Sequence, residues 1–327
     1  MQKMIQLERP CKGVVSLAIP TPFQIGDVNV YLLEGKKLTL VDTGANTEES
    51  WGLLTQGIEA AGYRLSDLQQ VVLTHFHEDH TGLAYRLKKE TGATVLAHPD
   101  TAVWLKEEPW FIERRNRFFL ELYKRAGVNE AYIQKIIGVY QYLRRFGHPC
   151  EVDVVLADGE TLPSHPEWKV VYTPGHSQTH FSLYRDSDEV MLLADHLIAH
   201  VSSNALLEPT VQSEEGRVKS LIQYRQELQK LKQFPISVGL AGHGEPIHDH
   251  VDLIDRRFDS MERRAENILE VLKGKQKTAF EVAMQLFPNR QDQLPLILSE
   301  TIGHLDWLEA EGRLARGVRD GIDRYSV

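Results

Sequence analysis

The most informative stretch of this sequence is His75-Phe76-His77-Glu78-Asp79-His80. It follows the apolar run 71–74 and precedes Thr81-Gly82, so it lies where a predicted strand passes through a turn into a helix. Neutral imidazole is the commonest protein ligand of zinc-like ions, and carboxylate supplies a harder second type. Positions 75 and 77 point to the same side of an extended segment and can hold one ion. The turn lets Asp79 and His80 reach a second ion.

The composition is that of an ordinary soluble globular chain, with 327 residues and a net charge of -9. This charge argues against broad affinity for nucleic acid or anionic membranes. The two cysteines, Cys11 and Cys150, form no CxxC pair and indicate a reducing compartment. Residues 1–10 contain no apolar signal core, and no run approaches the roughly 20 apolar residues of a membrane span. We therefore expect a cytoplasmic protein.

The N-terminal half alternates strands and helices, which predicts an α/β fold. Short strands are expected at 13–19, 28–34, 37–42, 71–74 and 94–97. Asn46 and Glu49 predict a capping box at the start of a helix, and a second helix is expected to end at Gly92. Asp42 leaves the third strand beside a glycine, where it either caps local backbone or supports the metal ligands.

Residues 101–147 interrupt this alternation with a helical insertion that is rich in aromatic side chains. Between 104 and 147 there are nine Lys or Arg residues against five Glu, so the insertion is basic within an acidic protein. Arg114, Arg115 and Arg117 form one cluster, and Arg144 and Arg145 form another. The insertion either packs its aromatic residues on the core, or walls the active site and attracts anionic or large apolar substrates.

The second half places further metal-binding residue types directly after predicted strands. Strands are expected at 152–156, 168–172, 181–184, 190–194 and 236–240. His176, Asp195 and His243 follow three of them. The candidate ligands are then His75, His77, Asp79, His80, His176, Asp195 and His243. Five histidines and two aspartates supply three ligands for each of two ions and one carboxylate to bridge them.

The order of these motifs resembles the metallo-β-lactamase superfamily. The motifs are Thr74 to His80, Gly175-His176, Asp195 and Gly242-His243-Gly244, with Asp42-Thr43-Gly44 upstream. The resemblance implies a four-layer αββα sandwich with two divalent ions at one edge between the sheets. It also implies that His75, His77 and His176 hold one ion, that Asp79, His80 and His243 hold the other, and that Asp195 bridges them. Zinc is the expected metal, with iron or manganese as alternatives.

Members of this kind often carry a helical insertion and a C-terminal winged-helix-like domain. We expect a catalytic domain over 1–250, a connecting helix over 251–274 and a winged-helix-like domain over 275–327. The last segment has seven Lys or Arg against eight Asp or Glu, which makes it a poor surface for binding phosphates. A role in packing, in completing the pocket or in a homodimer is therefore favoured over DNA binding.

The resemblance implies hydrolysis by a hydroxide that bridges two ions, with Asp79 and Asp195 as catalytic carboxylates. Asp195 argues against the true β-lactamases, which generally lack this aspartate. The complete ligand set argues against the persulfide dioxygenases, which use one iron and fewer ligands. His77 argues against the flavo-diiron members, which have glutamate at this position. We expect a small-molecule thioester, lactone or other ester as substrate. The alternative is a phosphodiesterase or endoribonuclease, so nucleic acid is disfavoured but stays open. A remote alternative is a non-catalytic binding module that metal stabilises.

Overall fold

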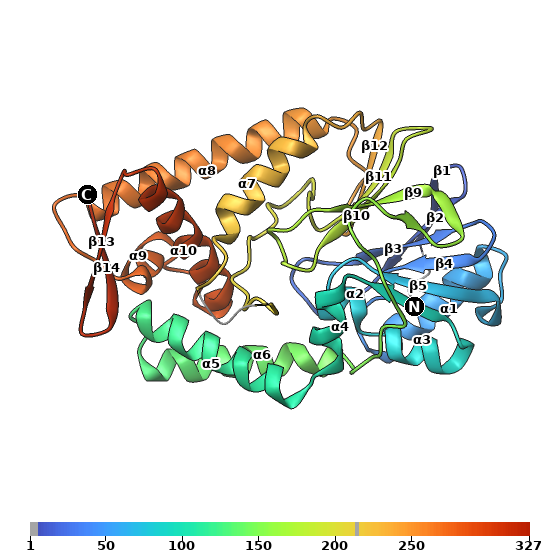
Figure 1. Cartoon of the computed structure of the whole chain (residues 1–327), viewed down its shortest axis with the longest axis horizontal. Coiled ribbons are helices and arrows are strands. Elements are labelled where there is room, and N and C mark those ends of the chain that lie inside the picture. Colours follow the sequence, from blue (N-terminus) through green and yellow to red (C-terminus); the bar gives the residue numbers. More distant parts are fainter. Residues whose placement is uncertain (1–5, 213–215) are drawn as a thin grey trace.

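The computed structural model describes residues 6–212 and 216–327 (Figure 1). Residues 1–5, part of the segment in which we predict no signal core, lie outside the described part. Among the helices of the described residues, none is both long enough and apolar enough to cross a membrane.

The first sheet has seven strands that lie side by side in the order of the sequence. They are β1 (Gln6–Cys11), β2 (Val14–Ile19), β3 (Val28–Leu33), β4 (Leu38–Val41), β5 (Leu68–Leu73), β6 (Thr94–Ala97) and β7 (Val154–Val155). Strands β1 to β4 are antiparallel, and β4 to β7 are parallel. The sequence pattern missed β1, and β7 is shorter than predicted. Before β7, the carboxylate of Asp153 accepts a hydrogen bond from the Val95 backbone NH, in place of a ladder bond.

The second sheet has five strands in the order β12-β11-β10-β9-β8. They are β8 (Thr161–Leu162), β9 (His165–Tyr172), β10 (Phe181–Arg185), β11 (Val190–Ala194) and β12 (Val238–Ala241). The β11–β12 pair is parallel and the other pairs are antiparallel. Side chains alternate between the two faces, so this sheet buries one face on the first sheet and the other on helices.

The sheets pack face to face and helices cover both outer faces. Along β5, Val72 belongs to the cluster between the sheets, with Trp168 and Phe181, whereas Val71 and Leu73 belong to the outer cluster. Helices α1 (Glu48–Ala60) and α3 (Ala84–Thr91) contribute to that outer cluster, and α7 (Ser220–Leu231) and α8 (His250–Leu272) cover the second sheet. The predicted four-layer αββα sandwich is confirmed.

Two helix ends show how well local signals place boundaries. Helix α3 ends as predicted at Gly92, whose φ of 71° lies in the left-handed region. The predicted cap at Asn46 is wrong by one residue, because Thr47 Oγ1 accepts the Ser50 backbone NH at the start of α1. The backbone NH of Asn46 instead donates to the carbonyl of Phe146 in the insertion.

The insertion and the C-terminal segment extend to one side of the sandwich (Figure 1). The insertion contains α4 (Pro99–Lys106), α5 (Pro109–Arg125), α6 (Glu130–Leu143) and the 3-10 turn η2 (Arg144–Phe146). The C-terminal segment contains α9 (Ala279–Leu286), η3 (Gln291–Gln293), α10 (Leu294–Ala310) and a hairpin of β13 (Ala315–Arg319) and β14 (Ile322–Ser326). The short elements η1 (Leu65–Asp67) and α2 (Glu78–Thr81) complete the chain's regular structure in the described part.

The C-terminal segment shares its core with the rest of the molecule. Leu298 and Leu305 of α10 belong to one buried cluster with Tyr123 of α5, Ile133 of α6 and Met191 of β11. Its first helix begins with the predicted capping box of Thr278 and Glu281. The segment is therefore packed on both the insertion and the second sheet. Its winged-helix character and the boundary at 275 stay predictions.

Candidate metal centre

The seven predicted ligands converge at the edge of the sandwich where strands of both sheets end. His75 follows β5, and His77 caps the short helix α2, which carries Asp79 and His80. From the second sheet, His176 follows β9, Asp195 follows β11 and His243 follows β12. Ligand atoms from these residues form three groups, in each of which they lie within 4.8 Å of one another. Two of the groups share no residue, and the third, His75, His80 and Asp195, has one histidine in common with each of them.

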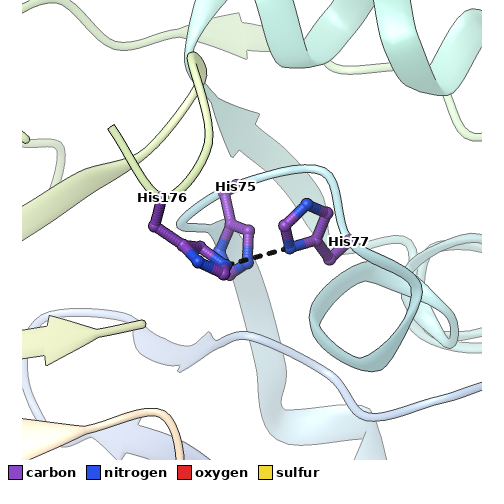
Figure 2. A group of neighbouring side chains, drawn as sticks. All are labelled: His75, His77 and His176. Carbon is purple, nitrogen blue, oxygen red and sulfur yellow. Dashed lines mark hydrogen bonds between the residues drawn. The ribbon is translucent and has the colours of Figure 1, made fainter. Parts of the chain in front are cut away.

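The first group is His75, His77 and His176 (Figure 2). Nε2 of His176 lies 3.2 Å from Nδ1 of His77, and the ring of His75 lies nearly perpendicular to both other rings. A tetrahedral zinc ion with bonds of about 2.0–2.1 Å holds its ligand atoms about 3.4 Å apart. The separation of these nitrogens therefore suits one ion.

The second group is Asp79, His80 and His243. Oδ2 of Asp79 lies 3.4 Å from Nε2 of His243, and Oδ1 lies 3.9 Å from Nε2 of His80. Two nitrogens and one carboxylate facing one point again provide a ligand set typical of zinc.

Asp195 lies between the two groups. Its Oδ1 is 3.4 Å from Nε2 of His80, and its Oδ2 is 3.6 Å from Nε2 of both His176 and His243. One carboxylate therefore contacts histidines of both groups, which is the position that a bridging ligand needs.

Unpaired polar atoms show independently that this cluster is suited to cations. Nε2 of His75, His80 and His243 and Oδ1 of Asp195 are buried without a hydrogen-bond partner among the described residues. A buried polar atom without a partner is costly, and four in one place are unusual. Metal ions would satisfy all four atoms, so the residues present fit the group that the motifs imply.

Asp42 and Thr74 orient two of the candidate ligands from behind. The carboxylate of Asp42 accepts hydrogen bonds from Nδ1 of His80 at 2.8 Å and from the backbone NH and hydroxyl of Thr74. Thr74 Oγ1 in turn lies 3.0 Å from Nδ1 of His75. Both Nε2 atoms are thereby left free for a ligand role. Of the two interpretations of Asp42, the structure supports the second: its carboxylate supports the cluster, and the backbone NH that it accepts is that of Thr74 beyond the neighbouring strand β5, not local backbone.

Backbone carbonyls orient two further rings. Nδ1 of His176 donates to the carbonyl of Asn204 at 2.9 Å, and Nδ1 of His243 donates to the carbonyl of Asp27 at 2.8 Å. These bonds fix the tautomer and turn each Nε2 toward the centre. Because a backbone acceptor is present at every residue, no side-chain pattern could have identified these two partners.

Glu208 is a site residue that the sequence pattern missed. It lies in the long loop before α7, and its Oε1 is 3.5 Å from Nε2 of His77. Its Oε2 accepts the backbone NH of Gln178 and the hydroxyl of Ser177, which hold the buried carboxylate in place. His77 therefore presents Nδ1 to the centre, the reverse of the other histidines. The sequence did not predict this role, because Glu208 lies in a loop that shows neither a strand pattern nor a helix pattern.

Electrostatics keep the carboxylates of the centre ionised. Burial opposes their charge, but His80 and His243 outweigh it, lowering the pKa of Asp79 to about 2 and that of Asp195 well below its usual value. Burial also lowers the pKa of His176 to about 4. Anionic carboxylates and the neutral imidazole of His176 therefore face the centre near pH 7. Against the effect of burial, the same carboxylates raise the pKa of His80 and His243, so metal ions would displace protons from these two rings.

A cavity of about 1540 Å³ opens above the candidate ligands. His77, Asp79, His176, Asp195 and His243 line its inner end. Helices α4, α5 and α6 form one wall, and α10 with the loop before it forms the opposite wall. Its size exceeds the roughly 300–1,000 Å³ usual for small-ligand pockets, so it suits a long or bulky substrate.

An αββα sandwich that gathers histidines and carboxylates at one edge between its sheets defines a class of metal-dependent hydrolases. The family model described as the metallo-beta-lactamase superfamily matches residues 24–243, more than half of the chain. The chain belongs to the metallo-beta-lactamase superfamily, and it is a metal-dependent hydrolase.

Three relatives place the chain within this superfamily. It is 36% identical over 303 residues to the probable metallo-hydrolase YqjP of Bacillus subtilis, covering 92% of this chain and 93% of that protein. It is 24% identical to an atrochrysone carboxyl ACP thioesterase of Aspergillus fumigatus, over 79% of this chain and 64% of that one. A crystal structure of a metallo-beta-lactamase family protein of Thermus thermophilus superposes with a TM-score of 0.81 at 30% identity, covering 97% and 99% of the two chains.

Proposed function

We propose that this protein hydrolyses thioesters or related esters at a centre of two divalent ions, with zinc as the expected metal. The observation that carries the proposal is the position of Asp195 between the two groups of candidate ligands. Zinc is favoured over harder ions because most ligand atoms are imidazole nitrogens, although iron or manganese also accepts such a set.

Bound ions would supply a water of lowered pKa and positive charge beside the scissile carbonyl. The residues of the chain supply the rest. Asp79, ionised at neutral pH, would accept a hydrogen bond from the attacking water and hold its orientation. Asp42, Thr74 and Glu208 keep the surrounding imidazoles in place, so that little reorganisation is needed during the reaction.

The cavity supports an acyl substrate. Its walls include Phe119, Ile136, Ile137, Leu296 and Phe287 from three different helices and a helix end, so an apolar acyl chain would find apolar contacts along its length. Distant relatives named as thioesterases include the atrochrysone carboxyl ACP thioesterase of Aspergillus fumigatus and the thioesterase pkgB of Emericella nidulans. At 24% and 23% identity these names favour the reaction class and leave the individual substrate open.

A panel of three substrates tests the proposal with the zinc-loaded protein. We expect turnover of an acyl coenzyme A thioester or an acyl lactone that exceeds turnover of bis(p-nitrophenyl) phosphate by at least about 100-fold in kcat/KM, or about 2.7 kcal/mol of transition-state stabilisation. Spectrophotometric release of thiol, acid and nitrophenol measures the three rates. Turnover of the phosphodiester alone would reverse the assignment in favour of a nuclease.

A further inference from the structure

The insertion carries an arginine cluster that the proposed chemistry does not use, and the fold separates its members. Arg114 and Arg117 of α5 line a smaller cavity of about 440 Å³ beside the C-terminal hairpin. Arg115 lines the large cavity above the metal centre. Consecutive residues of an α-helix point about 100° apart, which explains why one arginine of the cluster faces the site.

Arg115 is held in the cavity wall by a stack of aromatic rings. Its guanidinium lies over the ring of Trp104, with 5.8 Å between Cζ and the ring centroid. Trp104 stacks on Phe76 at 3.8 Å, and the ring of Phe76 lies 4.8 Å from that of His77. Two aromatic rings, and three successive contacts, therefore connect the cation to a candidate metal ligand. Trp104 is buried, so this wall is well packed.

Arg115 has no direct polar partner. In the described part of the chain it forms neither a hydrogen bond nor an ion pair. Two carboxylates act on Arg115 electrostatically, and one of them, Glu107, is already paired with Arg144. The other, Glu78, also lines the cavity and forms no ion pair with Arg115. Burial, with the charge of Arg144, lowers the pKa of Arg115 more than these two carboxylates raise it. Such a cation in a substrate cavity is more costly than a solvated one unless a ligand pairs with it.

We propose that Arg115 is a specificity-determining residue that binds an anionic group of the substrate, a carboxylate or a phosphate, while the scissile acyl group reaches the metal centre. This inference rests on the proposed esterase function. The planar guanidinium suits either anion because it donates two parallel hydrogen bonds to both. The anion has two possible sources, the far end of the acyl chain and the phosphates of a coenzyme A thiol.

Four thioesters separate these sources. Hexanoyl and adipoyl groups differ by a terminal carboxylate, and each is attached to coenzyme A, which carries phosphates, or to N-acetylcysteamine, which carries none. For Arg115→Gln we expect KM to rise roughly 10- to 100-fold for the substrates that carry the recognised anion, with kcat within about twofold. Hydrolysis of the uncharged hexanoyl-N-acetylcysteamine should be unchanged. A rise of KM for both coenzyme A thioesters identifies the phosphates as the anion, and a rise for both adipoyl thioesters identifies the terminal carboxylate.

Two further variants control for charge and for folding. Arg145→Gln removes an exposed arginine of η2 that does not line the cavity, and it should change none of the four KM values. Arg115→Lys keeps the charge but loses the second hydrogen bond, so its KM should lie between those of the wild type and Arg115→Gln. An equal rise of KM for all four substrates, or no rise for any, would overturn the proposal.

Binding of non-hydrolysable thioethers keeps this test separate from the test of the proposed function. Calorimetry would compare S-hexyl-coenzyme A and S-(5-carboxypentyl)-N-acetylcysteamine on metal-loaded wild type, Arg115→Gln and Arg145→Gln. If none of the four thioesters is hydrolysed, the esterase proposal fails. Arg115 nevertheless remains the anion site if one thioether binds the wild type at least about 10 times more tightly than Arg115→Gln. Failure of both thioethers to bind, or equal binding to all three proteins, would contradict the role of Arg115.

Discussion

Replacement of Asp195 by alanine is expected to lower kcat/KM by well over about 100-fold, which is more than the 10- to 100-fold typical of residues behind the metal ligands. The reason is its place between the two groups, where one carboxylate contacts His80, His176 and His243. Without it, two nearby cations would lack the anion that they share. The measurement is steady-state hydrolysis of the preferred thioester by the metal-loaded variant.

A matched variant separates this effect from a general loss of charge. Asp186→Ala removes an exposed aspartate from the turn after β10; this residue is close to Asp195 in the sequence but is not one of the candidate ligands. It should keep wild-type kcat/KM within about twofold, because isolated surface substitutions have small effects. Activity of Asp195→Ala within tenfold of the wild type would show that Asp195 does not bridge the ions.

The second large loss of activity is expected when alanine replaces Gly242, a change that adds a single methyl group. A Cβ added to Gly242 would lie 2.1 Å from Oδ1 of Asp195 and 3.0 Å from Cε1 of His80. The backbone cannot retreat easily, because the Gly242 NH donates to the carbonyl of Ala194 and its own carbonyl accepts the Asn29 NH. Gly242→Ala should therefore displace the carboxylate and reduce kcat/KM by more than about 100-fold, while overpacking costs about 1–3 kcal/mol of folding stability.

Gly52→Ala is the control for this substitution. Gly52 lies inside α1, and a Cβ there would meet no atom within 4 Å. This variant should be fully active and more stable by about 0.5–1 kcal/mol, since alanine favours a helix interior over glycine. Thermal unfolding followed by circular dichroism, beside the activity assay, checks both expectations. A Gly242→Ala enzyme with activity within threefold of the wild type would mean that the carboxylate can move without loss of function.

The sequence predicted the layers of the sandwich because hydrophobic alternation is a local property. Runs such as 71–74 and 190–194 show which segments are strands, and residue types that bind metals follow both of these and two further runs. The edge at which those strand ends meet brings together residues as distant as His75 and His243. The geometric grouping of the ligands agrees with the expected assignment, whereas their roles at bound ions stay predictions.

Features that depend on tertiary contacts escaped the sequence pattern. Thr47 and Asn46 are both good capping residues, so local preference does not distinguish them. In the structure the carbonyl of Phe146 in the insertion accepts the NH of Asn46, and Thr47 caps the helix. Glu208 has no local signal, because the loop that carries it is positioned by contacts with the turn at Ser177 and Gln178. The arginine cluster of the insertion likewise gave no indication that one member faces the site and two face away.

The central claim is that this fold assembles a centre for two ions, and counting the bound ions tests it most directly. The protein would be purified without chelators, loaded with zinc, passed through a desalting column and analysed by inductively coupled plasma mass spectrometry. Two groups of ligands joined by Asp195 predict two zinc ions per chain. A value of one ion or fewer per chain would contradict the account.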